Sequence, residues 1–174
     1  MTRPPNPIFQ VSEDASVLIA GQAPGNLADQ SGLPFTDPSG NRLRDWMGLT
    51  DAQFYDAKKV AIVPMGFCFP GYDRNGGDLP PIKRCASTWR SRLLQQLPNL
   101  QLVLLIGRYA QNWHLPNERR KSLTDIVRDW RRHLEDGLLP IPHPSWRNNR
   151  WLVRNPWFET DVIPEMRSRI GSLM

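Results

Sequence analysis

Four short apolar runs, each followed at once by glycine or proline, constrain the fold of this chain most strongly. The runs are Val17–Ala20, Val60–Val63, Leu102–Ile106 and Leu138–Ile141. The third has five apolar residues in a row, which suits a central strand that is covered on both faces. Helical patterns separate the runs, and this alternation predicts parallel strands with helices on both sides. We therefore expect an α/β fold, a three-layer α/β/α arrangement around a central four-stranded parallel sheet.

The spacing of apolar residues also predicts where helices form. The expected helices are a short one ending near Gly48, residues 82–97 with Cys85 and Trp89 on the apolar face, a helix that starts at a capping box of Ser122 and Asp125 and ends at Gly137, and about residues 161–170. Residues 1–16 are expected to be an irregular lead-in. The segments 21–40 and 65–81 hold so many glycines and prolines that both are expected to be loops.

Length and composition indicate a globular protein of one domain, residues 1–174, which we expect to be monomeric. No apolar run approaches the roughly 18 residues that span a membrane. The first residues lack the apolar core of a signal peptide, so a cytoplasmic location is expected. The net charge of +5 suggests a polyanionic partner, although an arginine-rich solvated surface is the alternative. The surplus is greatest over residues 107–158, with ten basic residues against five acidic ones.

In a parallel sheet, the loops that follow the strands gather at one edge. The loops beginning at Gly21, Pro64, Gly107 and Pro142 are thus expected to share one cleft. His143 lies between two prolines in the last of these loops, so its backbone is restrained on both sides. His114 and His133 have no such setting and are interpreted as ordinary structural residues. The sequence shows no zinc-ligand spacing, serine elbow, dinucleotide fingerprint or Walker loop.

Two motifs in these loops resemble a known family. G-Q-A-P-G at 21–25 with G-L-P-F ending at Phe35, and H-P-S at 143–145, are similar to motifs of the uracil-DNA glycosylase superfamily. The match is nearest to its iron–sulfur branch and covers about residues 17–150. The resemblance implies a monofunctional DNA N-glycosylase without lyase activity. Such an enzyme acts in base-excision repair, flips a deaminated base out of double- or single-stranded DNA and hydrolyses its N-glycosidic bond.

The resemblance also implies roles for individual residues. Phe35 would stack on the flipped base, and His143 would hydrogen-bond a base carbonyl as negative charge develops there. Gly21, Ala23 and Pro64 would line the base pocket. The residues expected to contact DNA are Pro24, Gly25, Arg108, Ser145, Trp146, Arg147, Asn148 and Arg150.

The chain departs from the family pattern at the group that activates water. The iron–sulfur branch has Glu where this chain has Gln22, and other branches have Asp or Asn where it has Ala23. An amide can orient water but cannot accept its proton. Gln22 is the hypothesised water orienter, and Asp29 is the nearest carboxylate that could act instead, with Asp37 as another.

Two further departures concern the base and the cofactor. Pro64 stands where the family usually has an Asn that reads uracil, so hypoxanthine and xanthine become plausible substrates beside uracil. Cys68 and Cys85 fall where two of the four cluster cysteines lie, and the other two are absent, so no cofactor or metal is expected. Two alternatives stay open: a catalytically weak or inactive protein that binds DNA lesions, and an unrelated α/β hydrolase or nucleotide-binding protein.

Overall fold

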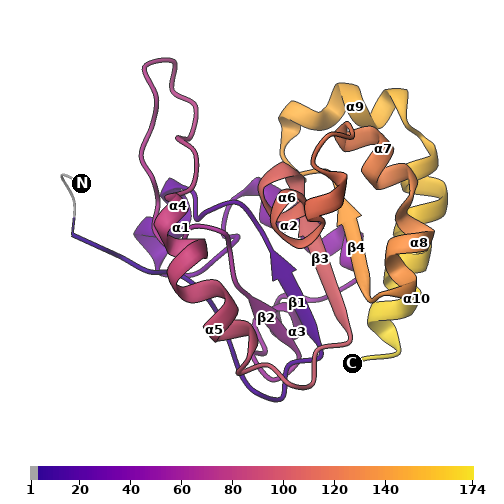
Figure 1. Cartoon of the computed structure of the whole chain (residues 1–174), viewed down its shortest axis with the longest axis horizontal. Helices are drawn as coiled ribbons and strands as arrows, with labels where there is room; N and C mark the ends of the chain where they lie inside the picture. The colour runs from indigo at the N-terminus through magenta and orange to yellow at the C-terminus, as the bar shows by residue number, and fades with distance from the viewer. Residues whose placement is uncertain (1–3) are drawn as a thin grey trace.

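The computed structural model describes residues 4–174 and has a parallel sheet at its centre (Figure 1). Its four strands are β1 (Val17–Ala20), β2 (Val60–Ile62), β3 (Leu102–Ile106) and β4 (Leu138–Ile141). They lie in the order β2-β1-β3-β4, and every neighbouring pair is parallel. The predicted strands and their direction are confirmed, with the second strand ending one residue earlier than expected. All four carboxyl ends therefore point to one edge of the sheet.

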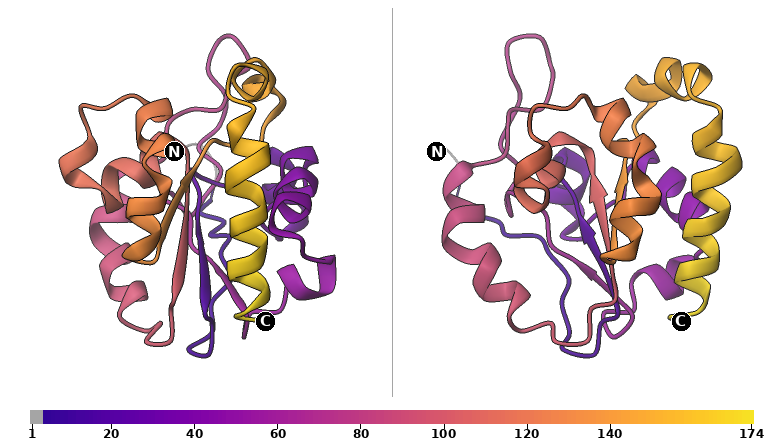
Figure 2. Two further views of the ribbon diagram at one scale, coloured as in Figure 1. Left: turned by 90° about the vertical axis from the view of Figure 1, so that its right-hand side faces the viewer. Right: turned by 45° about the vertical axis from the view of Figure 1, so that its right-hand side comes forward.

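Alternate residues of the strands pack into the hydrophobic cores on the two faces of the sheet, because successive side chains of a strand point to opposite faces. Val17 and Ile19 belong to the core that packs against α2 (Pro38–Met47), α3 (Asp51–Phe54) and α10 (Ile163–Gly171). Leu18 and Ala20 face the other side. The helices of that side are α4 (Lys83–Cys85), α5 (Ser91–Leu94) and α6 (Gly107–His114). Figure 2 shows these layers, which form the expected three-layer α/β/α fold.

The first loop contains a helix that the glycine pattern did not predict. Helix α1 runs from Asn26 to Ser31 between two glycines. Gly25 occupies its N-cap, and Gly32 ends it in the left-handed region at φ 73°. The expectation of an unbroken loop over 21–40 is therefore wrong, because these glycines cap a helix instead of preventing one. Helix α2 also begins inside this segment, with Asp37 as its N-cap.

The helix expected over residues 82–97 is interrupted by the π-helical turn η1 (Ala86–Arg90), which joins α4 to α5. A π turn accommodates one more residue than an α turn, so it rotates the residues around it. Trp89, predicted to face the core, is 50% exposed, whereas the side chain of Arg90 is fully buried. Cys85 is half-buried. Leu93, Leu94 and Leu97 do pack on the core as expected, so the apolar spacing misplaced Trp89 and not the whole face.

The remaining elements lie beside and beyond β4. The predicted capping box of Ser122 and Asp125 is confirmed, but the expected helix is divided at Asp129. The elements are α7 (Leu123–Arg128), α8 (Trp130–Glu135), the 3-10 turns η2 (Pro116–Glu118) and η3 (Trp146–Asn148), α9 (Asn149–Arg154) and the π-helical turn η4 (Phe158–Val162) before α10.

The N-terminal lead-in lies against the sheet edge. Expected to be irregular over residues 1–16, it has no helix from residue 4 onward, and residues 1–3 lie outside the described residues. Gln10 forms an antiparallel bridge with Ile62. Among residues 4–174, no helix combines the length and apolar character that crossing a membrane requires.

Candidate functional site

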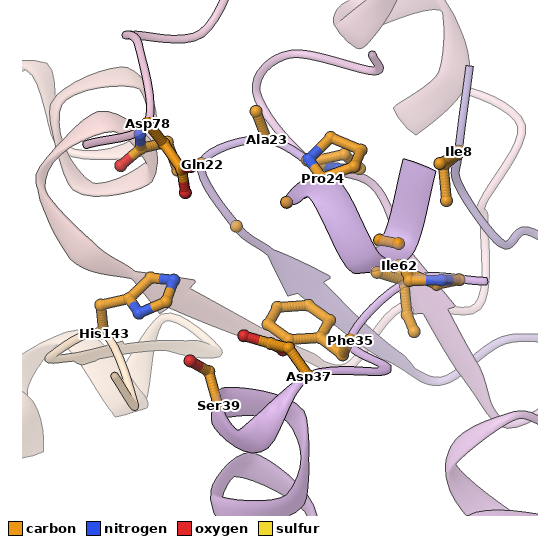
Figure 3. Close-up of a pocket in the computed structure, with 15 residues that line it drawn as sticks. Ile8, Gln22, Ala23, Pro24, Phe35, Asp37, Ser39, Ile62, Asp78 and His143 are labelled. Carbon is orange, nitrogen blue, oxygen red and sulfur yellow. The ribbon is translucent and has the colours of Figure 1, made fainter. Parts of the chain in front are cut away.

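A pocket opens at the carboxyl edge of the sheet, where the loops after β1, β2 and β4 meet (Figure 3). Its volume is about 80 Å³. One water needs on the order of 10–15 Å³, so the pocket has room for several waters or one small planar ring. Eight of the residues expected from the sequence line it: Gly21, Gln22, Ala23, Pro24, Gly25, Phe35, Pro64 and His143. The sheet edge thus brings together residues that are far apart in the chain.

His143 enters the pocket from the loop after β4, and its imidazole is held by the loop itself. The backbone N–H of Ser145 donates to Nδ1 at 3.2 Å, and the Asn148 amide donates to the His143 carbonyl at 2.7 Å. Burial lowers the pKa of His143, and the nearby carboxylates of Asp37 and Asp78 only partly oppose this effect. The ring is therefore neutral near pH 7. Because Nδ1 accepts a hydrogen bond, the proton is assigned to Nε2.

Phe35 has a backbone conformation that is rare for a residue with a side chain. Its φ is 57°, in the left-handed region, at a cost of about 1–3 kcal/mol. A Cβ on Gly40 would lie 1.8 Å from the Phe35 carbonyl oxygen, so only glycine fits at that position. Gly21 passes directly beside the ring, because a Cβ there would be 3.4 Å from the ring edge. Both glycines therefore serve the placement of one aromatic side chain.

A buried arginine behind Phe35 holds this conformation. Arg44 donates to the Phe35 carbonyl at 3.1 Å, and its guanidinium lies 5.2 Å from the centroid of the Phe54 ring. Its Nε forms an ion pair with Asp51 at 2.7 Å. The Tyr55 hydroxyl is 3.3 Å from the same carbonyl oxygen. Sequence analysis did not find Arg44, although an arginine within an apolar helix face is a usable signal.

Ile8, Ile62 and Pro64 form an apolar wall of the pocket. Behind it, the fully buried Arg90 donates to the carbonyls of Val63 at 2.6 Å and Pro64 at 3.3 Å. These carbonyls are thus already engaged on the inner side. Since proline has no N–H, the Pro64 backbone offers the pocket no donor.

Arg90 also contacts His114, at 2.8 Å between Nη2 and Nε2. Burial lowers the pKa of Arg90 to about 10, and burial together with the arginine charge lowers that of His114 to about 3. His114 does not line the pocket. The structural interpretation of His114 from the sequence agrees with this position.

The polar groups of the pocket include two carboxylates, Asp37 and Asp78. Asp37 caps α2 by accepting from the Gly40 N–H at 3.1 Å. Asp29 is the first carboxylate considered as an alternative to Gln22. It is not among the lining residues, and it accepts from the Asn6 amide at 3.1 Å. Gln22 lines the pocket, and its backbone carbonyl accepts from the Gly66 N–H at 2.9 Å.

The residues expected to contact DNA flank the pocket or brace its loops. Trp146 is 73% exposed on the loop after His143, with the Arg147 guanidinium 5.9 Å from its ring centroid. Arg150 is exposed on α9. Arg108 instead donates to the carbonyls of residues 119 and 121, at 3.0 and 2.8 Å.

Sequence reasoning missed several lining residues, namely Ile8, Ala28, Pro34, Ser39, Ile62 and Asp78, and weighed Asp37 only as an alternative. One feature of the sequence could have pointed to Asp78 as a site residue, namely its place in an unusually long loop after a strand.

The iron–sulfur cluster of the family branch that the sequence motifs resemble most does not fit this chain. A [4Fe–4S] cluster takes four thiolates, and the chain has two cysteines. Among residues 4–174, no three His, Cys, Asp or Glu side chains group closely enough to hold a metal ion.

Comparison with protein families gives a match that covers almost the whole fold. The model of the uracil DNA glycosylase superfamily matches residues 8–167. That range runs from Ile8 in the apolar wall through every loop of the pocket into α10. Members of this superfamily are generally DNA glycosylases, which supports DNA as the partner. The chain therefore belongs to the uracil DNA glycosylase superfamily.

Proposed function

We propose that this chain is a DNA glycosylase that flips a deaminated base into the pocket and hydrolyses its N-glycosidic bond. The observation that carries the proposal is the pairing of a neutral His143 with Phe35 in one cavity of ring size. Phe35 provides the stacking surface, and base–aromatic stacking contributes about 1–3 kcal/mol. The Nε2–H of His143 donates to a base carbonyl and stabilises the negative charge that forms as the bond breaks.

The same donor favours a deaminated base over its parent base where it meets the carbonyl that deamination creates. Deamination replaces an exocyclic amino group by a carbonyl, and an N–H donor pairs with the carbonyl but not with the amino group. A site that hydrogen-bonds one of two groups rejects the other strongly. The apolar wall of Ile8, Ile62 and Pro64 adds no second hydrogen bond. Uracil, hypoxanthine and xanthine therefore all belong to the substrate class proposed here.

Hydrolysis by water is the reaction type that the lining supports. The pocket lining contains no lysine among the described residues, so it offers no side-chain amine to form an imine with the sugar. Gln22 lines the cavity and is proposed to orient the attacking water.

The surface beside the pocket provides contacts to DNA. Trp146, Arg147 and Arg150 lie within seven residues of His143 and are exposed, so a duplex that delivers a base to the pocket would meet them. The exposed indole can fill the gap that a flipped base leaves, and the arginines can contact phosphates.

A panel of oligonucleotides that carry uracil, hypoxanthine or xanthine, single- and double-stranded, tests the proposal. Wild-type protein is expected to release at least one of these bases, and His143→Ala is expected to release it far more slowly. Gel-shift binding of the same oligonucleotides is the control. Binding without release of any base would instead support a protein that recognises lesions without excising them.

A further inference from the structure

Asp78 lies at the base of a projecting loop beside the pocket. Residues 69–80, here called the finger, extend away from the body of the protein in every view (Figures 1 and 2). The Asp73 carboxylate accepts from the backbone N–H of Asn75 at 2.8 Å and of Gly77 at 2.9 Å. Tyr72 and Asp78 then form an antiparallel bridge. The finger is thus a small hairpin whose backbone sets the position of Asp78.

The Asp78 carboxylate is turned to the pocket and is not used to hold the fold. It lines the same cavity as His143, and its charge acts on the imidazole. Among residues 4–174, it makes no hydrogen bond or ion pair with another side chain or backbone group. Asp37 differs, because its carboxylate caps α2. Figure 3 shows Asp78 on the same side of the pocket as Gln22.

Asp78 is exposed at the rim of the pocket, the part of the cavity that the sugar of a flipped nucleotide would reach. The base enters the cavity, but the sugar stays at the mouth because it remains joined to the phosphodiester backbone. Asp78 is solvent-exposed while lining the cavity, so it stands at this mouth. Water can reach C1′ from the same region, because the mouth is open to solvent at Asp78.

We propose that Asp78 is the catalytic carboxylate of this glycosylase, an inference that rests on the proposed function. The water oxygen forms a bond to C1′, and the C1′–N bond breaks with its electron pair passing to the base. The water proton passes to Asp78, which also stabilises the positive charge that develops on the sugar. Through solvent that proton is returned to the released base. Gln22 orients the water, so the neutral amide in the first motif no longer has to act as a base.

Single-turnover release of the best base from the panel, measured with wild type, Asp78→Asn, Asp37→Asn and Asp73→Asn, tests this role. Asp73→Asn is the matched control, since it removes one negative charge from the same finger while an Asn side chain can still accept from residues 75 and 77. Asp78→Asn is expected to lower the rate about 100-fold or more, which is the usual range for a general base. Its affinity for DNA should be unchanged or higher. The rate of Asp73→Asn should stay within about 3-fold.

Three results would overturn the assignment while leaving the proposed function intact. Asp78→Asn could release the base at the wild-type rate, or Asp37→Asn could lose activity while Asp78→Asn keeps it. Asp78→Asn could also change which base is released at an undiminished best rate, which would make the carboxylate a reader of the base. If wild type releases no base from any oligonucleotide, the proposed function itself fails, and the role of Asp78 fails with it.

Discussion

His143 and His114 are both partly buried histidines with a lowered pKa, but only His143 lines a cavity. His143 accepts a hydrogen bond at Nδ1, which leaves Nε2 to meet a ligand. His114 contacts the buried Arg90 through Nε2, so this nitrogen is already used inside the protein. Both side chains are partly buried, and burial lowers the pKa of both. What distinguishes the proposed functional histidine is therefore an open ring nitrogen beside a cavity, since a lowered pKa is common to both residues.

The largest expected effect is that the two histidine substitutions act on different properties: the one at His143 lowers activity, and the one at His114 lowers stability. His143→Ala should lower single-turnover base release about 10²–10³-fold, as removal of one donor to a developing anion does. Its free energy of unfolding should change by less than about 1 kcal/mol. His114→Ala should instead lower the free energy of unfolding by about 1–3 kcal/mol, because Arg90 loses a buried partner. Release assays and urea unfolding of the same two proteins measure both quantities.

The assignment of different roles to His143 and His114 would be contradicted if the two variants behaved alike. Loss of activity in folded His114→Ala would mean that the Arg90 cluster acts on the chemistry through the apolar wall. His143→Gln is a useful addition, since its amide N–H can still donate a hydrogen bond to a carbonyl. Partial recovery of the rate in this variant would separate hydrogen bonding from shape.

The second effect concerns stability at acid pH. His114 has a pKa of about 3 in the folded state and about 6.5 when unfolded, so below pH 6.5 the unfolded chain binds a proton that the folded chain does not. Stability is therefore lost as pH falls from about 6.5 towards 3, by up to about 1.4 kcal/mol per pH unit from this residue. His114→Gln, whose side-chain oxygen can still accept from Arg90, should reduce this slope by about one proton.

Urea unfolding of wild type and His114→Gln at several pH values between 4 and 7 measures the slopes. His133 and His143 have lowered pKa values too, so some acid sensitivity should persist in the variant. Parallel curves for the two proteins would contradict the assignment of a neutral, buried His114.

The smallest expected effect comes from the arginine that supports the other side of the pocket. Arg44→Met should release the strained Phe35 backbone, because its carbonyl loses the 3.1 Å hydrogen bond. Weaker stacking should raise the Kd for lesion-containing DNA about 10-fold, which matches a loss of about 1.4 kcal/mol and lies within the range of one base–aromatic contact. Fluorescence anisotropy with lesion-containing and undamaged oligonucleotides measures the affinity.

Tyr55→Phe is the matched control, since it removes one hydroxyl at the same carbonyl and keeps the arginine. It should give a smaller change in the same direction. If Arg44→Met lowered affinity equally for damaged and undamaged DNA, its role would be general stability and not the placement of Phe35.

Much of the pocket was predictable because it follows from short segments at the strand ends. The sequence placed Phe35, His143 and the loop from Gly21 to Gly25 at one edge, and the structure brings them together there. Of the predicted catalytic residues, His143 and Gln22 line the cavity and Asp29 does not. Asp78, which was not predicted, also lines it. No local pattern connects Asp78 with His143. Their proximity depends on how a long loop folds back over the sheet.

The sequence by itself determined the parallel α/β architecture and the rigid loop around His143, because apolar periodicity and paired prolines act over a few residues. Only the tertiary structure decided which polar groups support the pocket. Phe35 holds a positive φ since Arg44 and Gly40 meet its carbonyl, and Arg90 points inward because of a π turn. Such outcomes depend on contacts between distant segments, where the balance of burial and hydrogen bonding overrides local preference.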